Sequence, residues 1–274
     1  RRANPDYAAF YPGEDALLRR YLGGRGMKAV PPTLRASLAR VVTPTLERQR
    51  REGAVAVKFE AAYLRALDFG GASEAEAARV YARYARGGGA PGAAEYKPLQ
   101  DFLFRYVARE AGRLGLAVHV HTGSGVGAYF NVSGSDPALL EPALNDPSLR
   151  KTNFVLVHGG WPFAEAAGAL ILKPNVYADF SAQTFLRSPR ALSETLRGWL
   201  EFAPDKVLFA TDAFALTPEV GWEEVGWLSN RTGRDALALA LTGMLRDGQI
   251  TRARASELAR MALRDNAMSL YGIK

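Results

Sequence analysis

Cysteine is absent from the 274-residue sequence, and histidine occurs only three times. The lack of cysteine excludes disulfides and thiolate metal ligands, although it identifies no cellular compartment. A metal ion in this protein would therefore be held by nitrogen and oxygen atoms. Uninterrupted runs of about 18 or more apolar residues are also lacking, and without one no helix is expected to span a membrane.

The first residues, Arg1 to Asp6, contain neither an initiator methionine nor an apolar segment of the signal-peptide type. We expect the numbering to begin at an internal point of a longer chain, and a cytoplasmic location is favoured. The net charge of +7 comes largely from arginines interleaved with glutamates, as in residues 47–52. Nucleic-acid binders more often gather basic residues with exposed aromatics. We therefore expect neither a nucleic-acid nor a membrane partner.

Short hydrophobic runs alternate with helical patterns between residues 54 and 212. The expected strands are 54–60, 116–121, 154–158, 175–179 and 206–212. The expected helices are 14–21, 33–51, 73–86, 98–114, 137–149, 162–172, 188–202, 232–247 and 251–270. Strands that alternate with helices predict a parallel α/β sheet with helical cover. Pro44 is expected to kink or split the second of these helices.

The segment before residue 54 limits the choice of architecture. Residues 1–53 are a poorly assigned lead-in and helix, and we expect one domain over residues 1–274. A strand–helix unit takes about 30 residues, so this segment cannot supply the three further units of a (β/α)8 barrel. Either the fold is an open five-stranded sheet, or the chain holds the later strands of a barrel.

All three histidines stand at the ends of predicted strands. His119 and His121 share one face of strand 116–121, because side chains alternate along a strand. His158 ends strand 154–158 and precedes two glycines. The carboxyl ends of parallel strands are where α/β folds place active sites. We predict that His121 and His158 bind a metal, the alternative being histidines hydrogen-bonded at strand ends. His119 lies one layer deeper, and ligand, supporting and core roles stay open for it.

Two charged positions extend this pattern. Asp212 ends strand 206–212, and a carboxylate above a buried strand needs a partner to offset its desolvation. A metal would supply that partner, and a helix cap is the alternative; Asp179 is a similar cap or supporting carboxylate. Lys58 shares a face with Glu60. An ion pair of Lys58 with Glu60 or Asp212 is slightly favoured over a buried neutral lysine that forms a metal-bridging carbamate.

Imidazoles and carboxylates on separate strands suit a divalent metal, most readily Zn²⁺. An open coordination position would lower the pKa of bound water, and Asp212 would take the proton as general base. The loops 122–136 and 213–231 are expected to shape a pocket for a small-molecule substrate. Asn131 and Trp161 are candidate substrate contacts, with Trp222 and Trp227 on the second loop.

Five segments together resemble the amidohydrolase superfamily, and most closely its amidohydrolase-2 branch with the nodulin/FluG-like proteins. They are HTG at 121–123, VHGGWPF at 157–163, NVYAD at 175–179, ATDAF at 210–214 and ALRDNAMSLYG at 262–272. The combination is fairly specific, whereas each segment alone is not. The similarity runs from about residue 54 to the end.

The resemblance implies a (β/α)8 TIM-barrel-type fold with one or two divalent metals. It implies His121 and His158 as the ligands on strands five and six, and Asp212 as ligand and base on strand eight. Lys58 matches the strand-four position that is a carboxylated lysine in some members. Tyr63 and Arg65 resemble substrate-side residues after that strand.

One departure from the family pattern concerns the first barrel strand. That strand carries a His-x-His metal pair, and no histidine precedes residue 54. We therefore expect strands four to eight to be present and the barrel to be incomplete at its N-terminal side.

The expected function is that of a metal-dependent hydrolase acting on a C–N or C–O bond of a small polar substrate. A non-oxidative decarboxylase or an isomerase is the alternative within the fold, which does not decide between them. A non-catalytic binding barrel is the alternative of a different class. A homo-oligomer is compatible with the sequence.

Overall fold

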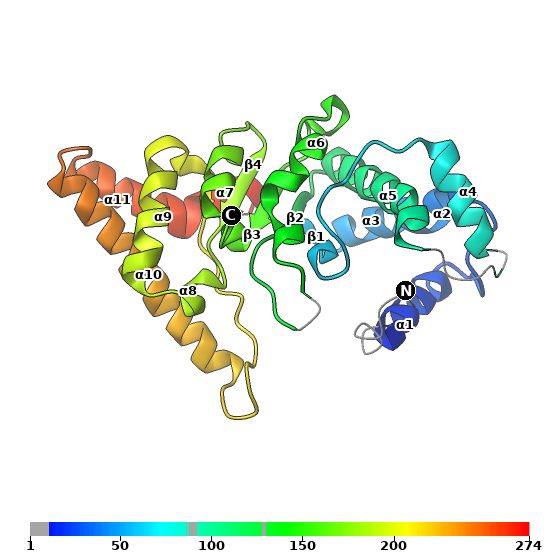
Figure 1. Ribbon diagram of the computed structural model, residues 1–274, viewed down its shortest axis with the longest axis horizontal. Helices are drawn as coiled ribbons and strands as arrows, with labels where there is room; N and C mark the ends of the chain where they lie inside the picture. Colours follow the sequence, from blue (N-terminus) through cyan, green and yellow to red (C-terminus); the bar gives the residue numbers. More distant parts are fainter. Residues whose placement is uncertain (1–10, 86, 88–91, 128–129, 274) are drawn as a thin grey trace. The chain divides into compact units, whose positions relative to one another are not determined.

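The structure is a computed structural model that describes residues 11–85, 87, 92–127 and 130–273 (Figure 1). The chain divides into two compact units, and the expectation of one domain stays a prediction. The first unit comprises Arg1–Val55, Asp68–Leu116 and Pro142–Thr152, and the second comprises Ala56–Leu67, Ala117–Glu141 and Asn153–Lys274. Expectations for residues 1–10 lie outside the described residues.

The first unit is helical. Its helices are α1 (Tyr11–Gly23), α2 (Leu34–Ser37), the π-helical turn η2 (Leu38–Val42), α3 (Thr43–Arg51), α4 (Glu74–Ala85), α5 (Ala93–Leu114) and the 3-10 turn η6 (Pro147–Leu149). Its core is formed by Leu34, Leu38, Ala77 and Leu99. The predicted split at Pro44 is not found, because helical backbone continues from Leu34 to Arg51; the π-helical turn η2 directly precedes Pro44's helix α3, and a kink there stays a prediction. Proline has no N–H to donate to the preceding turn.

The second unit is built on a five-stranded parallel sheet. The strands are β1 (Ala56–Phe59), β2 (Ala117–His121), β3 (Phe154–Val157), β4 (Val176–Asp179) and β5 (Val207–Leu208), in the order β1-β2-β3-β4-β5. Strands are present in all five predicted segments, although the last contains only Val207 and Leu208 of the expected range 206–212. A doubly wound sheet reverses its strand order part-way. Here each connection leads to the next strand, so right-handed crossovers all lie on one face, as in a barrel.

Helices and short turns connect and follow these strands. They are η3 (Ala61–Tyr63), η4 (Ser133–Ser135), η5 (Pro137–Leu140), α6 (Glu141–Leu144), η7 (His158–Gly160), α7 (Ala164–Leu170), α8 (Gln183–Leu186), α9 (Pro189–Phe202), η8 (Pro204–Lys206), α10 (Trp222–Arg246), α11 (Arg252–Arg260), η9 (Met261–Asp265) and α12 (Asn266–Tyr271). The helices α9 and α10 pack along each other (Figure 1).

Two helix expectations are corrected. Residues 137–149 form two 3-10 turns and one short helix instead of a single helix. Prolines at 137, 142 and 147 each lack the N–H that a continuous helix would use. The helix expected at 232 already begins at Trp222, so the second half of the predicted loop 213–231 is helical.

The two faces of the sheet bury different side chains. Val118, Val120, Phe154 and Leu156 alternate with the histidine face and are fully buried. On the opposite face, the register pairs Lys58 with His119, and His119 with Val155. The histidine face also packs Val155 and Val157 against Ala267 and Leu270 of α12. The alternation therefore places Lys58, His119 and His121 on the face that α12 covers, whereas His158 follows β3 with a left-handed backbone and leaves the alternation.

None of the helices in the described part of the chain combines the length and the apolar character needed to cross a bilayer.

Candidate active site

His121 and His158 lie side by side at the ends of neighbouring strands. Their ring centroids are 4.6 Å apart with an interplanar angle of 76°. Both residues are almost fully buried, at 3% and 2% exposure. Burial lowers the pKa of both imidazoles, to about 4 for His158, and the neighbouring His121 ring also lowers the pKa of His158. Both are therefore neutral near pH 7, which is the form that binds metals.

His158 is held from one side by residues that follow β4. Its Nδ1 lies 2.7 Å from the Ser181 hydroxyl, which in turn donates a short hydrogen bond to Asp179 Oδ1. The same Oδ1 accepts the backbone N–H of His158 at 3.0 Å and that of Ser181 at 2.9 Å. Asp179 thus has the cap-like, supporting role that was one alternative for it.

Asp212 faces His158, but not from the end of a strand. Its Oδ2 is 3.9 Å from His158 Nε2. The expected strand 206–212 already ends at Leu208, because the N–H of Phe209 bonds to the carbonyl of Ala262 and the chain leaves the sheet. Partial burial raises the pKa of Asp212, and the positive charge of Lys58 opposes this effect.

The backbone is strained at both His158 and Asp212. Their φ angles are 68° and 54°, in the left-handed region that is unfavourable for residues with a side chain. Among the described residues, Ala182 is the one further non-glycine position with positive φ. Strain of this kind gathers at functional sites and persists only where the surroundings impose it.

Lys58 and Glu60 form the ion pair that the sequence favoured, with Lys58 Nζ 2.9 Å from Glu60 Oε1. The alternative of a buried neutral lysine is not supported, since the Lys58 side chain is 38% exposed. Glu60 Oε2 also lies 3.5 Å from His121 Nδ1. Glu60 was expected only as a partner of Lys58, although its position two residues after Lys58, on the face of the histidines, was a signal for the site.

The second ring nitrogen of His121 is engaged by the loop after β2. Nε2 lies 2.6 Å from the carbonyl oxygen of Ser124, which can only accept, so Nε2 carries the proton in the neutral ring. The ring of Tyr63 packs edge-on against His121 at 4.7 Å. These contacts fix the orientation of the imidazole and direct Nδ1 toward Glu60.

His119 has a separate environment. Its Nε2 lies 2.8 Å from the hydroxyl of Tyr271 in α12. Burial lowers the pKa of His119 and raises that of Tyr271, so both groups are uncharged near pH 7. Tyr271 was not anticipated from the sequence, because a residue 152 positions away gives no local signal. Of the roles left open for His119, the supporting role is the one with an observed contact.

A family model described as amidohydrolase matches residues 1–273. The chain belongs to the amidohydrolase family. Protein fluG of Emericella nidulans is 31% identical over 184 residues, which is 65% of this chain. The chain spans only 20% of that relative's length.

Two solved structures show the same fold. A protein from Lactobacillus casei described as a metal-dependent hydrolase superimposes with a TM-score of 0.74 and 22% identity, over 88% of this chain and 61% of that one. Uronate isomerase from Thermotoga maritima gives a TM-score of 0.71 and 17% identity, over 93% and 57% of the two chains. At these identities the similarity establishes the fold alone, and it confirms the TIM-barrel-type prediction.

The residues of this amidohydrolase that were predicted to contact substrate differ in their observed contacts. Tyr63 contacts the ring of His121, whereas the observed contact of Trp161 is its backbone carbonyl, which accepts the hydroxyl of Ser124 at 3.3 Å. Arg65 Nε donates to the carbonyl of Ala66 at 2.9 Å. Asn131 Oδ1 accepts the Ser133 hydroxyl and the Gly134 N–H, and thereby shapes its own loop. Their substrate roles stay predictions.

Trp222 and Trp227 were expected on a pocket loop, and this placement is wrong. Both belong to helix α10 and are 61% and 68% exposed. The acidic pair Glu223 and Glu224 in the first turn favours a helix start here, because negative charge is stabilised at a helix N-terminus.

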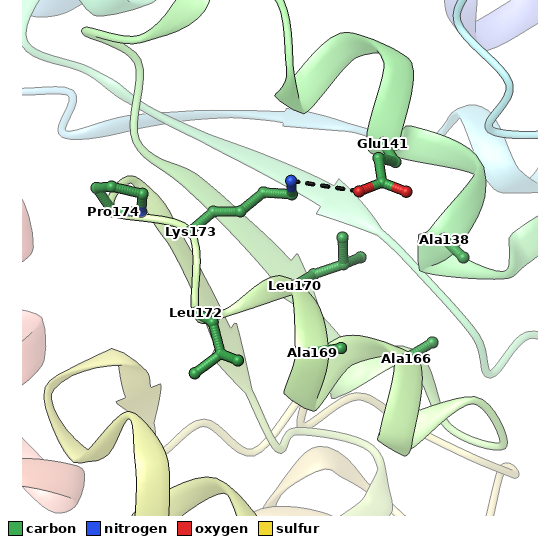
Figure 2. Close-up of a pocket in the computed structure, with 8 residues that line it drawn as sticks. All are labelled: Ala138, Glu141, Ala166, Ala169, Leu170, Leu172, Lys173 and Pro174. Atoms are coloured by element: carbon green, nitrogen blue, oxygen red, sulfur yellow. Dashed lines mark ion pairs between the residues drawn. The ribbon is translucent and has the colours of Figure 1, made fainter.

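A pocket of about 540 Å³ lies at α7 (Figure 2). Lys173 and Glu141 form an ion pair of 3.3 Å across it, and its other lining side chains are apolar. None of the candidate site residues lines this pocket.

Within the described ranges, no three histidine, cysteine, aspartate or glutamate side chains form a group that could hold a metal ion. The structure brings together His121 with His158 and Glu60, and His158 with Asp212. Their assignment as ligands, together with those of Lys58 and His119, stays a prediction.

Proposed function

We propose that this amidohydrolase is a metal-dependent hydrolase that activates water to cleave a C–N or C–O bond in a small polar substrate. The observation that supports the proposal most strongly is the neutral, buried pair His121 and His158. Each of these rings directs one nitrogen toward a carboxylate.

The proton positions make this arrangement suited to a cation. Ser181 donates its proton to Asp179, so its oxygen accepts from His158 Nδ1–H and leaves Nε2 with a lone pair. That lone pair faces Asp212 at 3.9 Å. In His121 the bare nitrogen is Nδ1, which faces Glu60 at 3.5 Å. Two acceptors that face each other repel unless a proton or a cation lies between them.

The donor set fits a divalent metal, with Zn²⁺ as the proposed ion. His121, His158 and Asp212 would hold it, since two imidazoles and one carboxylate are a common catalytic zinc set. Lys58 and His119 are less suited, because their observed partners are Glu60 and Tyr271. A metal bound there would lower the pKa of a coordinated water and polarise the substrate carbonyl.

Asp212 is the proposed general base. Burial raises its pKa from the ordinary value, which brings a carboxylate closer to the range where it can take a proton from water and return it. Its side chain is 35% exposed, so a substrate can reach it. Tyr63, which contacts the ring of His121, and Trp161, which follows the turn η7 after His158, would orient the substrate.

The chain spans only part of the length of its relatives, so the activity of the whole protein is itself a proposal. The fold does not determine which reaction is catalysed. The similarity to uronate isomerase concerns the fold, so a sugar isomerase, a decarboxylase and a non-catalytic barrel are outcomes that the experiment distinguishes. Hydrolysis is recognised because one oxygen of the product comes from water.

The experiment uses zinc-loaded protein and a panel of small polar amides, esters and lactones in ¹⁸O-labelled water. We expect turnover that places the label in a product carboxylate and that Asp212→Asn abolishes while the fold stays intact. Asp205→Asn, an exposed carboxylate in the turn η8 before β5, serves as the control. Turnover without label, or full activity of Asp212→Asn, would contradict the proposal.

A further inference from the structure

We propose that Asp179 and Ser181 are positioning residues that hold His158 in a single tautomer, with its proton on Nδ1. The tautomer itself follows from hydrogen bonding in the metal-free chain. Its use, the presentation of Nε2 as a ligand, rests on the proposed function. Nothing in the sequence around Ser181 suggests this role, because the contact joins two separate strand ends.

The direction of each hydrogen bond follows from what each atom can do. A carboxylate oxygen only accepts, so the Ser181 hydroxyl must donate to Asp179 Oδ1. The serine proton is then committed, and the 2.7 Å contact with His158 requires that Nδ1–H donates to the serine oxygen. In a neutral imidazole that leaves Nε2 unprotonated.

Burial favours one set of donor and acceptor directions in the hydrogen bonds that join Asp179, Ser181 and His158. Asp179, Ser181 and His158 are only 5%, 2% and 2% exposed, so water competes little for these atoms. A hydrogen bond at low local polarity is stronger, and reversing one member would leave a buried acceptor facing another acceptor. One orientation of the three groups is therefore strongly favoured.

The same carboxylate also fixes the backbone that carries the ring. Asp179 Oδ1 accepts the His158 N–H at 3.0 Å, and Gln183 Nε2 donates to the His158 carbonyl at 2.9 Å. Both backbone groups of a residue with φ of 68° are thus tied down. Asp179 sets the backbone and, through Ser181, the ring.

A merely structural reading would make Asp179 a cap of the turn after β4, with the imidazole indifferent to its tautomer. The two interpretations predict different tautomers of the His158 ring once the Ser181 hydroxyl is removed. If Ser181 were only packed against the ring, Ser181→Ala would leave the tautomer unchanged. If Ser181 positions His158, Ser181→Ala removes the tautomer preference, whereas Asp179 Oδ1 still accepts its hydrogen bond from the His158 backbone N–H.

The experiment is ¹⁵N nuclear magnetic resonance of metal-free protein labelled at histidine, at neutral pH. Three histidines give few signals, and His158→Gln assigns those of residue 158. We expect the wild type to show a protonated Nδ1 and a bare Nε2. Ser181→Ala should give mixed or reversed tautomers and bind Zn²⁺ about 10- to 100-fold more weakly. Ser193→Ala, which removes another buried serine hydroxyl in α9, should change neither.

The wild-type spectrum alone can overturn the inference, even if Ser181→Ala fails to fold. A His158 with its proton on Nε2, or a spectrum that Ser181→Ala leaves unchanged, contradicts it. The predicted tautomer in a protein that binds no Zn²⁺ would keep the positioning role and reject the proposed function. The two failures are therefore distinguishable.

Discussion

His158 and Asp212 combine two unfavourable features, a left-handed backbone and partial or full burial of a polar group. Their φ angles of 68° and 54° are maintained by neighbours, and at His158 these are Asp179 and Gln183. Each such residue costs about 1–3 kcal/mol, which a fold retains where the geometry serves a purpose. At the scale of single residues, backbone strain therefore occurs at two of the three proposed metal ligands.

The first prediction concerns His158 as a ligand. His158→Ala should lower the zinc content of reconstituted protein from one ion per chain to a small fraction, as measured by elemental analysis. His119→Ala is the matched control, because His119 bonds to Tyr271 and lies outside the pair. Unchanged stoichiometry in His158→Ala would exclude direct coordination by this residue.

The second prediction concerns pH. Burial lowers the pKa of His158 from 6.5 to about 4, so between these values the unfolded chain binds a proton that the folded chain does not. Stability should therefore be fully present above pH 6.5 and fall as the pH decreases toward 4. The shift corresponds to about 3 kcal/mol in metal-free protein.

Chemical unfolding of metal-free protein at several pH values tests this effect. His158→Gln should flatten the decrease, and the part that remains should come from His121 and His119, whose pKa values burial also lowers. A wild-type stability that rises on acidification through this range would contradict the burial argument.

Sequence alone identified the histidine pair because three histidines at strand ends leave few alternatives. It could not identify Ser181 or Tyr271, since their contacts with His158 and His119 join positions 23 and 152 residues apart. The sequence also placed Asp212 at a strand end, which is wrong because the strand ends at Leu208. The apolar pattern of residues 206–212 does not reveal that the Phe209 N–H donates to the carbonyl of Ala262 and not to a neighbouring strand.

At the scale of elements, the strands were predictable because runs such as 154–157 are apolar on both faces, as buried parallel strands require. Helix α10 was partly missed, because Gly221 and two exposed tryptophans resemble a loop in composition. The break of residues 137–149 into turns shows the opposite error. There, three prolines outweighed an apolar spacing that favours a helix.

The third prediction concerns the turn that follows β3. A side chain at Gly159 would have φ of +54° and meet the ring of Trp199 at 2.2 Å. Gly159→Ala should lower the free energy of unfolding by about 3 kcal/mol or more through strain and overpacking. Gly248→Ala, with φ of +71° and nothing within 4 Å, should cost only about 1 kcal/mol.

Thermal or chemical denaturation of the two glycine variants measures the difference. Equal losses would show that the close approach of Trp199 to the turn is not maintained in solution.

The fourth prediction concerns helix α9, which buries Leu192, Leu196 and Trp199 on one side. Leu196 has 0% exposure, so Leu196→Ala should cost about 2–5 kcal/mol by loss of burial and creation of a cavity. Phe202 in the same helix is 75% exposed, and Phe202→Ala should change stability by less than about 0.5 kcal/mol. Urea titrations measure the free energy of unfolding of both variants. Similar losses for the two would contradict the burial of Leu196 and the exposure of Phe202.

At the scale of the whole molecule, the strand order bears on the choice of architecture, which the sequence had left open between an open five-stranded sheet and part of a barrel. Five parallel strands in the order of the chain exclude a doubly wound sheet for this unit, and the family match agrees with the barrel type. The sequence could not decide this, because both folds have the same alternation of strands and helices. His119 lies on the face that α12 covers, where its ring contacts the hydroxyl of Tyr271.

The central claim is that the neutral pair His121 and His158, with Asp212, binds one divalent cation. Titration of Zn²⁺ into chelator-treated protein, followed by calorimetry, tests it most directly. We expect saturation at one ion per chain, with proton release small near pH 7 because burial keeps both imidazoles neutral. Absence of saturable binding, or equal binding by the His121→Ala and His158→Ala variants, would contradict the account.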